Sequence, residues 1–377
     1  MKNWKITLLI LLLALAVAAT GCKSRRGGGG GPPAVDNNGD GQENPVVIAT
    51  FESRQLDRLP SGLFSAALGI NSNRQVVGLS DNGTARELRG VMWIVAADGS
   101  PSAPLELAPL AGNSYSASYG INDAGIAVGE SAKAADTVAV YWPAGSNTAV
   151  ELILPASAGP AAAYAISGQD RIVGEARDAG GNMAAVLWLG AASAPTLLPL
   201  LPGGTTGASY GIDPSSTKIV GESENADGRM RAVVWSVAAD GTAGDPVDLG
   251  TLSGHDRSIA LGISSAGRIV GESESPAGET HAVIWAEGEA SGYSIVDLGP
   301  AQMNSSAIAV SDSGLIAGWS ETDGAPRAAA WHALSADLSN SSAILGGSGF
   351  SQAYGINNND VVVGMAADQG FVAMPGP

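Results

Sequence analysis

Short apolar runs separated by Gly, Asn, Asp and Ser turns follow one another from residue 52 to the end of the chain. A clear unit contains four such runs, at Val247–Gly250, Ile259–Ser264, Arg268–Ser273 and His281–Trp285. Short runs rich in Val, Ile and Ala and bounded by turn residues predict β-strands. Helical periodicity does not occur beyond the N-terminal segment. The pattern therefore predicts an all-β fold built from four-stranded units.

The unit recurs seven times, and its third run carries a repeated glycine. These glycines are Gly78, Gly129, Gly174, Gly221, Gly271, Gly318 and Gly364. The fourth run ends in tryptophan in six units, at Trp93, Trp142, Trp188, Trp235, Trp285 and Trp331. Four strands in about 47 residues are the size of one propeller blade, so we predict a seven-bladed β-propeller, with an open β-repeat solenoid as the alternative. We predict that the tryptophans pack between blades as core.

An extra strand-like run, Val46–Phe51, precedes the first unit, whose own first run is at Gln55–Asp57. Closure of a ring removes exposed end repeats. We hypothesise that this extra run pairs with the seventh blade, beside Phe371–Met374, and joins the two ends of the ring.

The N-terminus has the pattern of a bacterial lipoprotein precursor. Lys2 and Lys5 flank its start, and the apolar run Ile6–Ala19 is shorter than a comfortable membrane span. The run leads to Ala19-Thr20-Gly21-Cys22, which resembles a lipoprotein box and implies lipidation of Cys22, the only cysteine. We predict a signal peptide over residues 1–21, a tether over 22–45 and the propeller over 46–377. The implied location is the cell envelope, at the outer membrane or cell surface, with the membrane contacted through the lipid.

The tether is rich in Gly, Pro, Asp and Asn, a composition that cannot pack a core. Asp36, Asn38 and Asp40, followed by Gly41, match the opening of a calcium loop. Val47 stands at the twelfth position, where an EF-hand has a bidentate Glu. We therefore favour a polar linker and keep calcium as a weak alternative; no other cofactor is predicted.

Several units, among them SYGINDAGIAVGES and AYGINNNDVVVGMA, resemble the HAF family of bacterial extracellular repeats. The resemblance covers residues 52–374. The family's His-Ala-Phe triplet appears here as His281-Ala282-Val283. The resemblance implies an exported repeat protein and assigns no activity to any residue.

The charge balance and the scarce reactive side chains exclude some classes of function. A net charge of −17 argues against nucleic acid as a partner. Gly207–Gly211 matches the G-x-S-x-G nucleophile motif, but it aligns with the second strand of the repeat, so we interpret it as a strand. His255, His281 and His332 fall at different repeat positions and give no metal-ligand spacing. We predict no catalytic residue.

The candidate site is a set of glutamates. Glu130, Glu175, Glu222 and Glu272 each follow the repeated glycine, whereas Leu79, Trp319 and Met365 take that place in the other units. If this position faces the axis or one rim, four carboxylates form an arc that could bind a cation or a basic ligand. Solvated strand ends repeated by duplication are the plainer interpretation. We favour a binding or scaffold module for an unknown protein or polysaccharide; the alternative is an extracellular polysaccharide-degrading enzyme that uses carboxylates.

Overall fold

The computed structural model describes residues 50–83, 87–133, 136–155, 159–288, 292–299, 303–333, 342–344 and 349–376. Cys22 and the candidate calcium ligands Asp36, Asn38 and Asp40 lie outside these ranges. The described residues form strands, turns and loops without a helix. No helix long and apolar enough to cross a membrane is found among the described residues.

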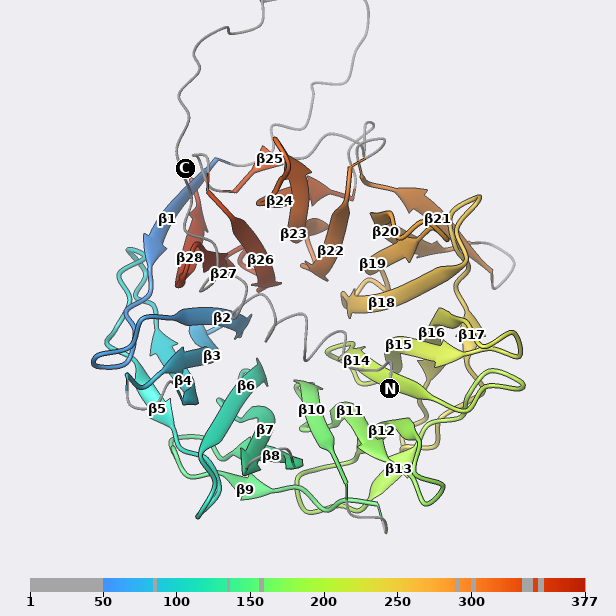
Figure 1. Cartoon of the computed structure of the whole chain (residues 1–377), viewed down its shortest axis with the longest axis horizontal. Coiled ribbons are helices and arrows are strands. Elements are labelled where there is room, and N and C mark those ends of the chain that lie inside the picture. The colour runs from blue at the N-terminus through green and yellow to red at the C-terminus, as the bar shows by residue number, and fades with distance from the viewer. Residues whose placement is uncertain are drawn as a thin grey trace, which may run out of the picture. The chain divides into compact units, whose positions relative to one another are not determined.

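Seven antiparallel sheets of four strands each stand in a ring (Figure 1). The all-β, seven-bladed β-propeller predicted from the repeats is confirmed. In each blade the first strand lies innermost and the fourth lies at the circumference (Figure 1). The ring follows chain order, so that each sequence repeat supplies one radial layer of the core.

The first four blades have the following strands. Blade 1 contains β2 (Ser65–Ile70), β3 (Gln75–Asp81), β4 (Leu88–Ile94) and β5 (Leu105–Leu107). Blade 2 contains β6 (Tyr115–Ile121), β7 (Ala127–Lys133), β8 (Asp136–Trp142) and β9 (Val150–Glu151). Blade 3 contains β10 (Ala161–Ile166), β11 (Ile172–Arg177), β12 (Met183–Trp188) and β13 (Pro195–Leu197). Blade 4 contains β14 (Gly207–Ile212), β15 (Lys218–Glu224), β16 (Met230–Ser236) and β17 (Val247–Asp248).

The remaining blades complete the ring. Blade 5 contains β18 (Arg257–Ile263), β19 (Ile269–Glu274), β20 (Thr280–Glu287) and β21 (Tyr293–Asp297). Blade 6 contains β22 (Ser305–Val310), β23 (Leu315–Thr322), β24 (Ala325–His332) and β25 (Ser342–Ala343). Blade 7 contains β26 (Ser351–Ile356), β27 (Val362–Ala366), β28 (Gln369–Pro375) and, at its outer edge, the N-terminal strand β1 (Phe51–Gln55).

The two ends of the ring are joined by β1 and β28, which pair from Phe51 opposite Pro375 to Gln55 opposite Phe371. A strand before the first blade does pair beside Phe371–Met374, as hypothesised, but it runs from Phe51 to Gln55 and overlaps the hypothesised run Val46–Phe51 only at Phe51. Pairing begins at Phe51, where the hypothesised run ends, and residues 46–49 lie outside the described ranges.

The sequence units and the blades are also offset by one strand. The first run of each unit is the outer strand of the preceding blade, as β17 shows by pairing with β16. The first unit's own first run therefore continues the strand that closes blade 7, because Gln55 is the last residue of β1 and the N–H of Leu56 donates to the carbonyl of Gly370. An outer strand has the same short apolar pattern whichever blade it joins, so the repeat alone did not reveal this offset.

The six repeated tryptophans are fully buried between neighbouring blades. Trp93 of blade 1, for example, shares a hydrophobic cluster with Val361, Val363 and Val372 of blade 7. Its indole N–H donates to the carbonyl of Asp57 at 2.8 Å, which satisfies the polar atom of this large ring. Trp142, Trp188 and Trp235 donate to equivalent carbonyls just after the outer strands of the preceding blades.

Neighbouring innermost strands pack backbone against backbone around the axis, and β26 contacts β2 to complete the circle. A Cβ at Gly120 would lie 2.8 Å from the carbonyl oxygen of Tyr164 in the next blade. A Cβ at Gly69 would likewise lie 2.7 Å from the carbonyl oxygen of Tyr119. Small residues at this repeat position therefore permit the close approach of the blades at the centre of the ring.

Hydrogen bonds also link the turns between the first and second strands of successive blades. The Asn71 amide donates to the carbonyl of Asn122 at 2.8 Å. The Asn357 amide of blade 7 donates to the carbonyl of Asn71 at 2.9 Å, across the junction where the ring closes. All three asparagines are buried, so these bonds satisfy groups that would otherwise be costly to remove from water.

Candidate functional site

The site is built around a β-bulge that recurs in every innermost strand. The register between the first and second strands shifts by one residue at the same place in all seven blades. The extra residue at this bulge is Leu68, Tyr119, Tyr164, Tyr210, Leu261, Ile308 or Tyr354. A bulge of this kind changes the direction of a side chain.

The repeated glycine is required by the same bulge. A Cβ built on Gly129 would lie 1.9 Å from the carbonyl oxygen of Ala117, and the other repeated glycines give 1.9–2.1 Å. The glycine that marks the unit in the sequence is therefore the partner of a bulged strand and carries no chemistry of its own.

The residue after this glycine faces a small residue of the innermost strand. Glu130, Glu175 and Glu222 stand opposite Ala117, Ala162 and Ala208. Each of these glutamates accepts a hydrogen bond from the tyrosine at the bulge of its own blade. The bonds are Tyr119 to Glu130 at 2.7 Å, Tyr164 to Glu175 at 2.8 Å and Tyr210 to Glu222 at 2.9 Å.

The three tyrosines also contact one another from blade to blade. The ring centroids of Tyr119 and Tyr164 are 5.6 Å apart, and those of Tyr164 and Tyr210 are 5.4 Å apart. Both pairs are tilted, an arrangement that aromatic rings favour. We call these three tyrosines, their three glutamates and Tyr115, whose hydroxyl also donates to Glu130 at 2.8 Å, the tyrosine–glutamate arc.

Burial dominates the electrostatics of the arc. Glu130 is 2% exposed, and its desolvation raises the pKa of its carboxyl, against the two tyrosine hydrogen bonds that lower it. Desolvation raises the pKa of Glu175 to about 7; the Tyr164 hydrogen bond opposes this shift and the nearby charge of Glu130 adds to it. Burial likewise raises the pKa of Tyr119 and Tyr210, so these hydroxyls remain neutral donors. Two carboxyls with raised pKa values, Glu130 and Glu175, therefore accept hydrogen bonds from tyrosine hydroxyls in adjacent blades.

The fourth predicted glutamate, Glu272, occupies the equivalent place in blade 5, opposite Ile259. Its bulge carries Leu261 where blades 2 to 4 carry tyrosine. Three of the four predicted glutamates therefore pair with a bulge tyrosine. The fourth, Glu272, lies in blade 5, which has no tyrosine at its bulge. Sequence reasoning had treated the tyrosines only as strand residues.

The other half of the ring has apolar residues at the glutamate position, although blade 7 keeps a tyrosine, Tyr354, at its bulge. Leu79 and Met365 are buried at the glutamate position of blades 1 and 7. In blade 6 this position is Trp319, which is half-buried, unlike the six core tryptophans. Its cross-strand partner Ser306 is 1% exposed, and its hydroxyl has no hydrogen-bond partner among the described residues. The residue after the repeated glycine is therefore acidic in blades 2 to 5 and apolar in blades 6, 7 and 1.

Two histidines at different repeat positions, which nothing in the sequence links, are in contact at blade 5. The rings of His255 and His281 lie 5.3 Å apart, and His281 Nδ1 is 2.8 Å from Asp297 Oδ2. The same cross-strand place holds Arg231 with Asp248 in blade 4 and Arg89 with Glu106 in blade 1. We therefore interpret His281–Asp297 as a variant of a repeated structural pair.

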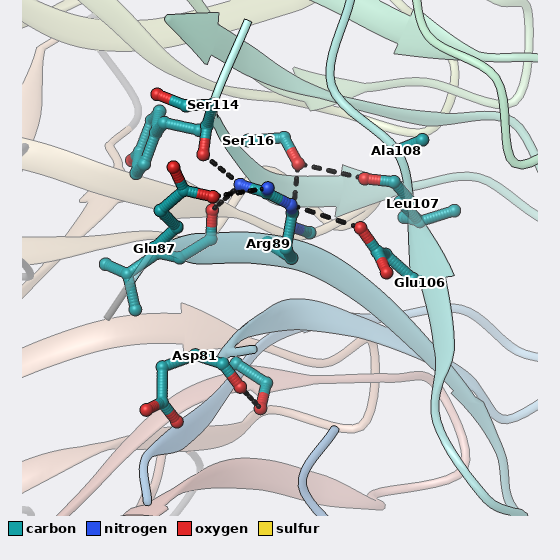
Figure 2. Close-up of polar contacts among 12 residues, drawn as sticks. Asp81, Glu87, Arg89, Glu106, Leu107, Ala108, Ser114 and Ser116 are labelled. Carbon is teal, nitrogen blue, oxygen red and sulfur yellow. Dashed lines mark hydrogen bonds and ion pairs between the residues drawn. The ribbon is translucent and has the colours of Figure 1, made fainter. Parts of the chain in front are cut away.

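Arg89 shows how this chain neutralises acids away from the arc. Figure 2 shows its guanidinium between Glu87, at 2.6 Å, and Glu106, at 3.1 Å, with the Ser114 carbonyl as a further acceptor. A guanidinium that faces two carboxylates offsets part of their charge and hydrogen-bonds both. Neither Glu130 nor Glu175 has an ion pair of this kind with any described residue.

Two other candidate chemistries can be judged from the geometry. Ser209, within the G-x-S-x-G match, is fully buried in β14, and its hydroxyl lies within hydrogen-bond distance of the carbonyl oxygens of Gly174 and Val186. It is a link between blades rather than an exposed nucleophile. Within the described ranges, no group of three or more His, Cys, Asp or Glu residues is arranged to hold a metal ion.

No family model matches the chain, and no curated protein matches it. Solved structures share its fold. It is similar to a structure from a study of two prolyl endopeptidases, with a TM-score of 0.54 and 11% identity over 81% of this chain and 46% of that chain. It is also similar to the β-propeller domain of the Trilobed protease from Pyrococcus furiosus, with a TM-score of 0.53 and 10% identity over 83% of this chain and 96% of that one.

Identities this low show the fold alone. The class that the fold defines is the β-propeller. The Pyrococcus domain is described as having an open velcro topology, whereas β1 of this chain is hydrogen-bonded to β28.

Proposed function

We propose that this chain is an exported, lipid-anchored binding module of the bacterial cell envelope, related to the HAF repeats, and that the tyrosine–glutamate arc binds a group of a protein or polysaccharide. The anchor is supported by the lipoprotein-like segment that ends at Cys22. The recurrence of the tyrosine–glutamate pair in three consecutive blades supports the site.

The break in symmetry is the observation that carries this proposal. The bulge and its glycine occur in all seven blades, so the fold needs them everywhere. The fold needs no tyrosine–glutamate pair, because blades 1, 5 and 6 form the same bulge around Leu68, Leu261 and Ile308. Aromatic faces beside a few convergent polar groups on a rigid scaffold are typical of ligand sites.

One observation favours a second candidate, the polysaccharide-degrading enzyme. A carboxyl whose pKa lies at about 7, as for Glu175, suits a general acid, and Glu130 and Glu222 in the adjacent blades offer a second carboxylate. We rank this candidate below binding because all three glutamates have similar tyrosine partners, whereas an acid and a base need different environments.

The test uses the full chain in a neutral detergent, immobilised and exposed to cell-surface polysaccharides and envelope extract. We expect one ligand class to be retained by the wild type. The variant Glu130→Gln/Glu175→Gln/Glu222→Gln should retain it at least about tenfold less tightly, because charge-assisted hydrogen bonds are lost. Glu279→Gln, in an exposed hairpin of blade 5, is the matched control.

Three outcomes separate the alternatives. Loss of retention in the triple variant alone, without turnover, supports a binding module with its site at the arc. Release of shortened polymer by the wild type but not by Glu175→Gln would favour the enzyme instead. Equal retention by the wild type and the triple variant would contradict a site at the arc.

A further inference from the structure

We propose that the group bound at the arc is an organic cation with an apolar part, such as an alkylammonium group; this inference rests on the proposed function and names its ligand class. It combines three observations: two carboxylates, Glu130 and Glu175, without a cationic partner among the described residues, adjacent tyrosine rings, and apolar residues at the same repeat positions of blade 6.

The first observation is charge. Glu130 is almost completely buried, and among the described residues its only hydrogen-bond donors are the hydroxyls of Tyr115 and Tyr119. Within the described ranges, the hydroxyl of Tyr164 is the only hydrogen-bond donor to the Glu175 carboxyl. A buried carboxylate without a counter-charge is costly, so the state without ligand favours bound protons. A ligand cation would supply the charge that Arg89 supplies to Glu106 in blade 1 (Figure 2).

The second observation is the aromatic surface. The rings of Tyr119, Tyr164 and Tyr210 form a continuous series beside these carboxylates, with neighbouring centroids less than 6 Å apart. An ammonium or quaternary ammonium group over such faces gains cation–π attraction of about 0.5–2 kcal/mol, and more when it is desolvated. Sugars also stack on tyrosine, but a neutral sugar would not stabilise the ionised form of Glu130 and Glu175, whereas a cation would.

A divalent metal ion suits this arrangement less well. Calcium takes about six to eight oxygen ligands. Each blade of the arc offers a single carboxylate, with Oε1 already engaged by a tyrosine hydroxyl. A larger, softer cation that contacts rings as well as oxygens fits the spacing of one group per blade.

The third observation is the apolar side. Leu261 and Ile308 occupy the bulge positions of blades 5 and 6, and Trp319 occupies the glutamate position of blade 6; all three are half-buried. Beside Trp319, the buried hydroxyl of Ser306 lacks a hydrogen-bond partner among the described residues. A ligand with a cationic end at the arc would place its hydrocarbon part towards this side, where burial of each methylene contributes about 0.8 kcal/mol.

The experiment is titration calorimetry on the full chain in a neutral detergent with small probes. Choline is compared with its uncharged isostere, in which a tert-butyl group replaces the trimethylammonium. Butyltrimethylammonium is compared with tetramethylammonium, and calcium chloride is a separate probe. We expect choline to bind at least about tenfold more tightly than its isostere, and butyltrimethylammonium more tightly than tetramethylammonium.

Variants locate the effect. Glu130→Gln/Glu175→Gln should abolish the preference for choline, and Glu279→Gln should retain it. Both glutamine changes remove buried charge and keep an oxygen for the tyrosine hydroxyls, so folding should be preserved; Tyr164→Phe gives an independent loss of affinity. Equal affinity for choline and its isostere, a preference unaffected by these variants, or binding of calcium alone would each overturn the inference. Retention of a neutral polysaccharide that depends on the arc, without ammonium binding, would overturn it and leave the proposed function standing.

Discussion

Deletion of Phe51–Gln55 is expected to lower the melting temperature by at least about 10 °C, because β1 is the strand that joins the two ends of the ring. Its loss exposes the edge of β28 and removes the five cross-strand pairs between the two strands. It also shifts Leu56, which is fully buried and whose N–H donates to the carbonyl of Gly370 at 2.8 Å. Thermal unfolding followed by circular dichroism measures the effect.

Deletion of Gly27–Gly31 from the tether removes the same number of residues and is the matched control. Its melting temperature should equal that of the full chain. If both deletions melt alike, β1 does not hold the ring closed, and blade 7 is stable as a three-stranded sheet.

Gly129→Ala is expected to destabilise the propeller by about 3 kcal/mol, the second-largest effect that we predict. The new Cβ would lie 1.9 Å from the carbonyl oxygen of Ala117, a backbone atom that cannot move without disturbing the bulge. The displacement would also misplace Tyr119 relative to Glu130, so affinity for any ligand of the arc should fall with stability. Denaturant unfolding gives the free energy.

The control is Gly292→Ala, at an exposed position where an added Cβ meets no atom within 4 Å. We expect a change of less than about 0.5 kcal/mol there. If Gly129→Ala were as mild as Gly292→Ala, the repeated glycine would not be a steric requirement of the bulge.

The number of blades could be predicted from the sequence because the repeated glycine and the repeated tryptophan are both sterically required. Gly129 and its equivalents oppose a bulged carbonyl, and Trp142 and its equivalents fill the space between blades. Replacement of either residue would destabilise the fold, so both recur at the same position of nearly every repeat. The sheet to which an outer strand belongs depends on long-range pairing. The two residues of β17 do not reveal in the sequence that they pair with β16.

The candidate site was predictable only in part, for a similar reason. The glutamates after the repeated glycine stood out because acids at a fixed repeat position are unusual. Their tyrosine partners lie 11 or 12 residues earlier on another strand, and only the bulge directs each hydroxyl to the carboxylate. The approach of His255 to His281 likewise depends on a loop that lies beside the third strand of its own blade.

Glu175 provides a test of the arc through its proton. Its folded pKa of about 7 lies above the ordinary value of 4.5, so the folded state favours the protonated carboxyl. The stability that this preference contributes is complete below about pH 4.5 and is lost as the pH rises through about 7. Glu175→Gln should therefore be more stable than the wild type at pH 8, and this advantage should disappear in acid.

The most direct measurement is the titration of the Glu175 side-chain carboxyl by carbon NMR, with the resonance assigned by its loss in Glu175→Gln. A midpoint near pH 7 is the result expected if the Glu175 carboxyl is desolvated and has no cation beside it in the folded protein. A midpoint near pH 4.5 would mean that the charge of Glu175 is already solvated or paired, and would contradict both the electrostatics of the arc and the ligand class inferred from it.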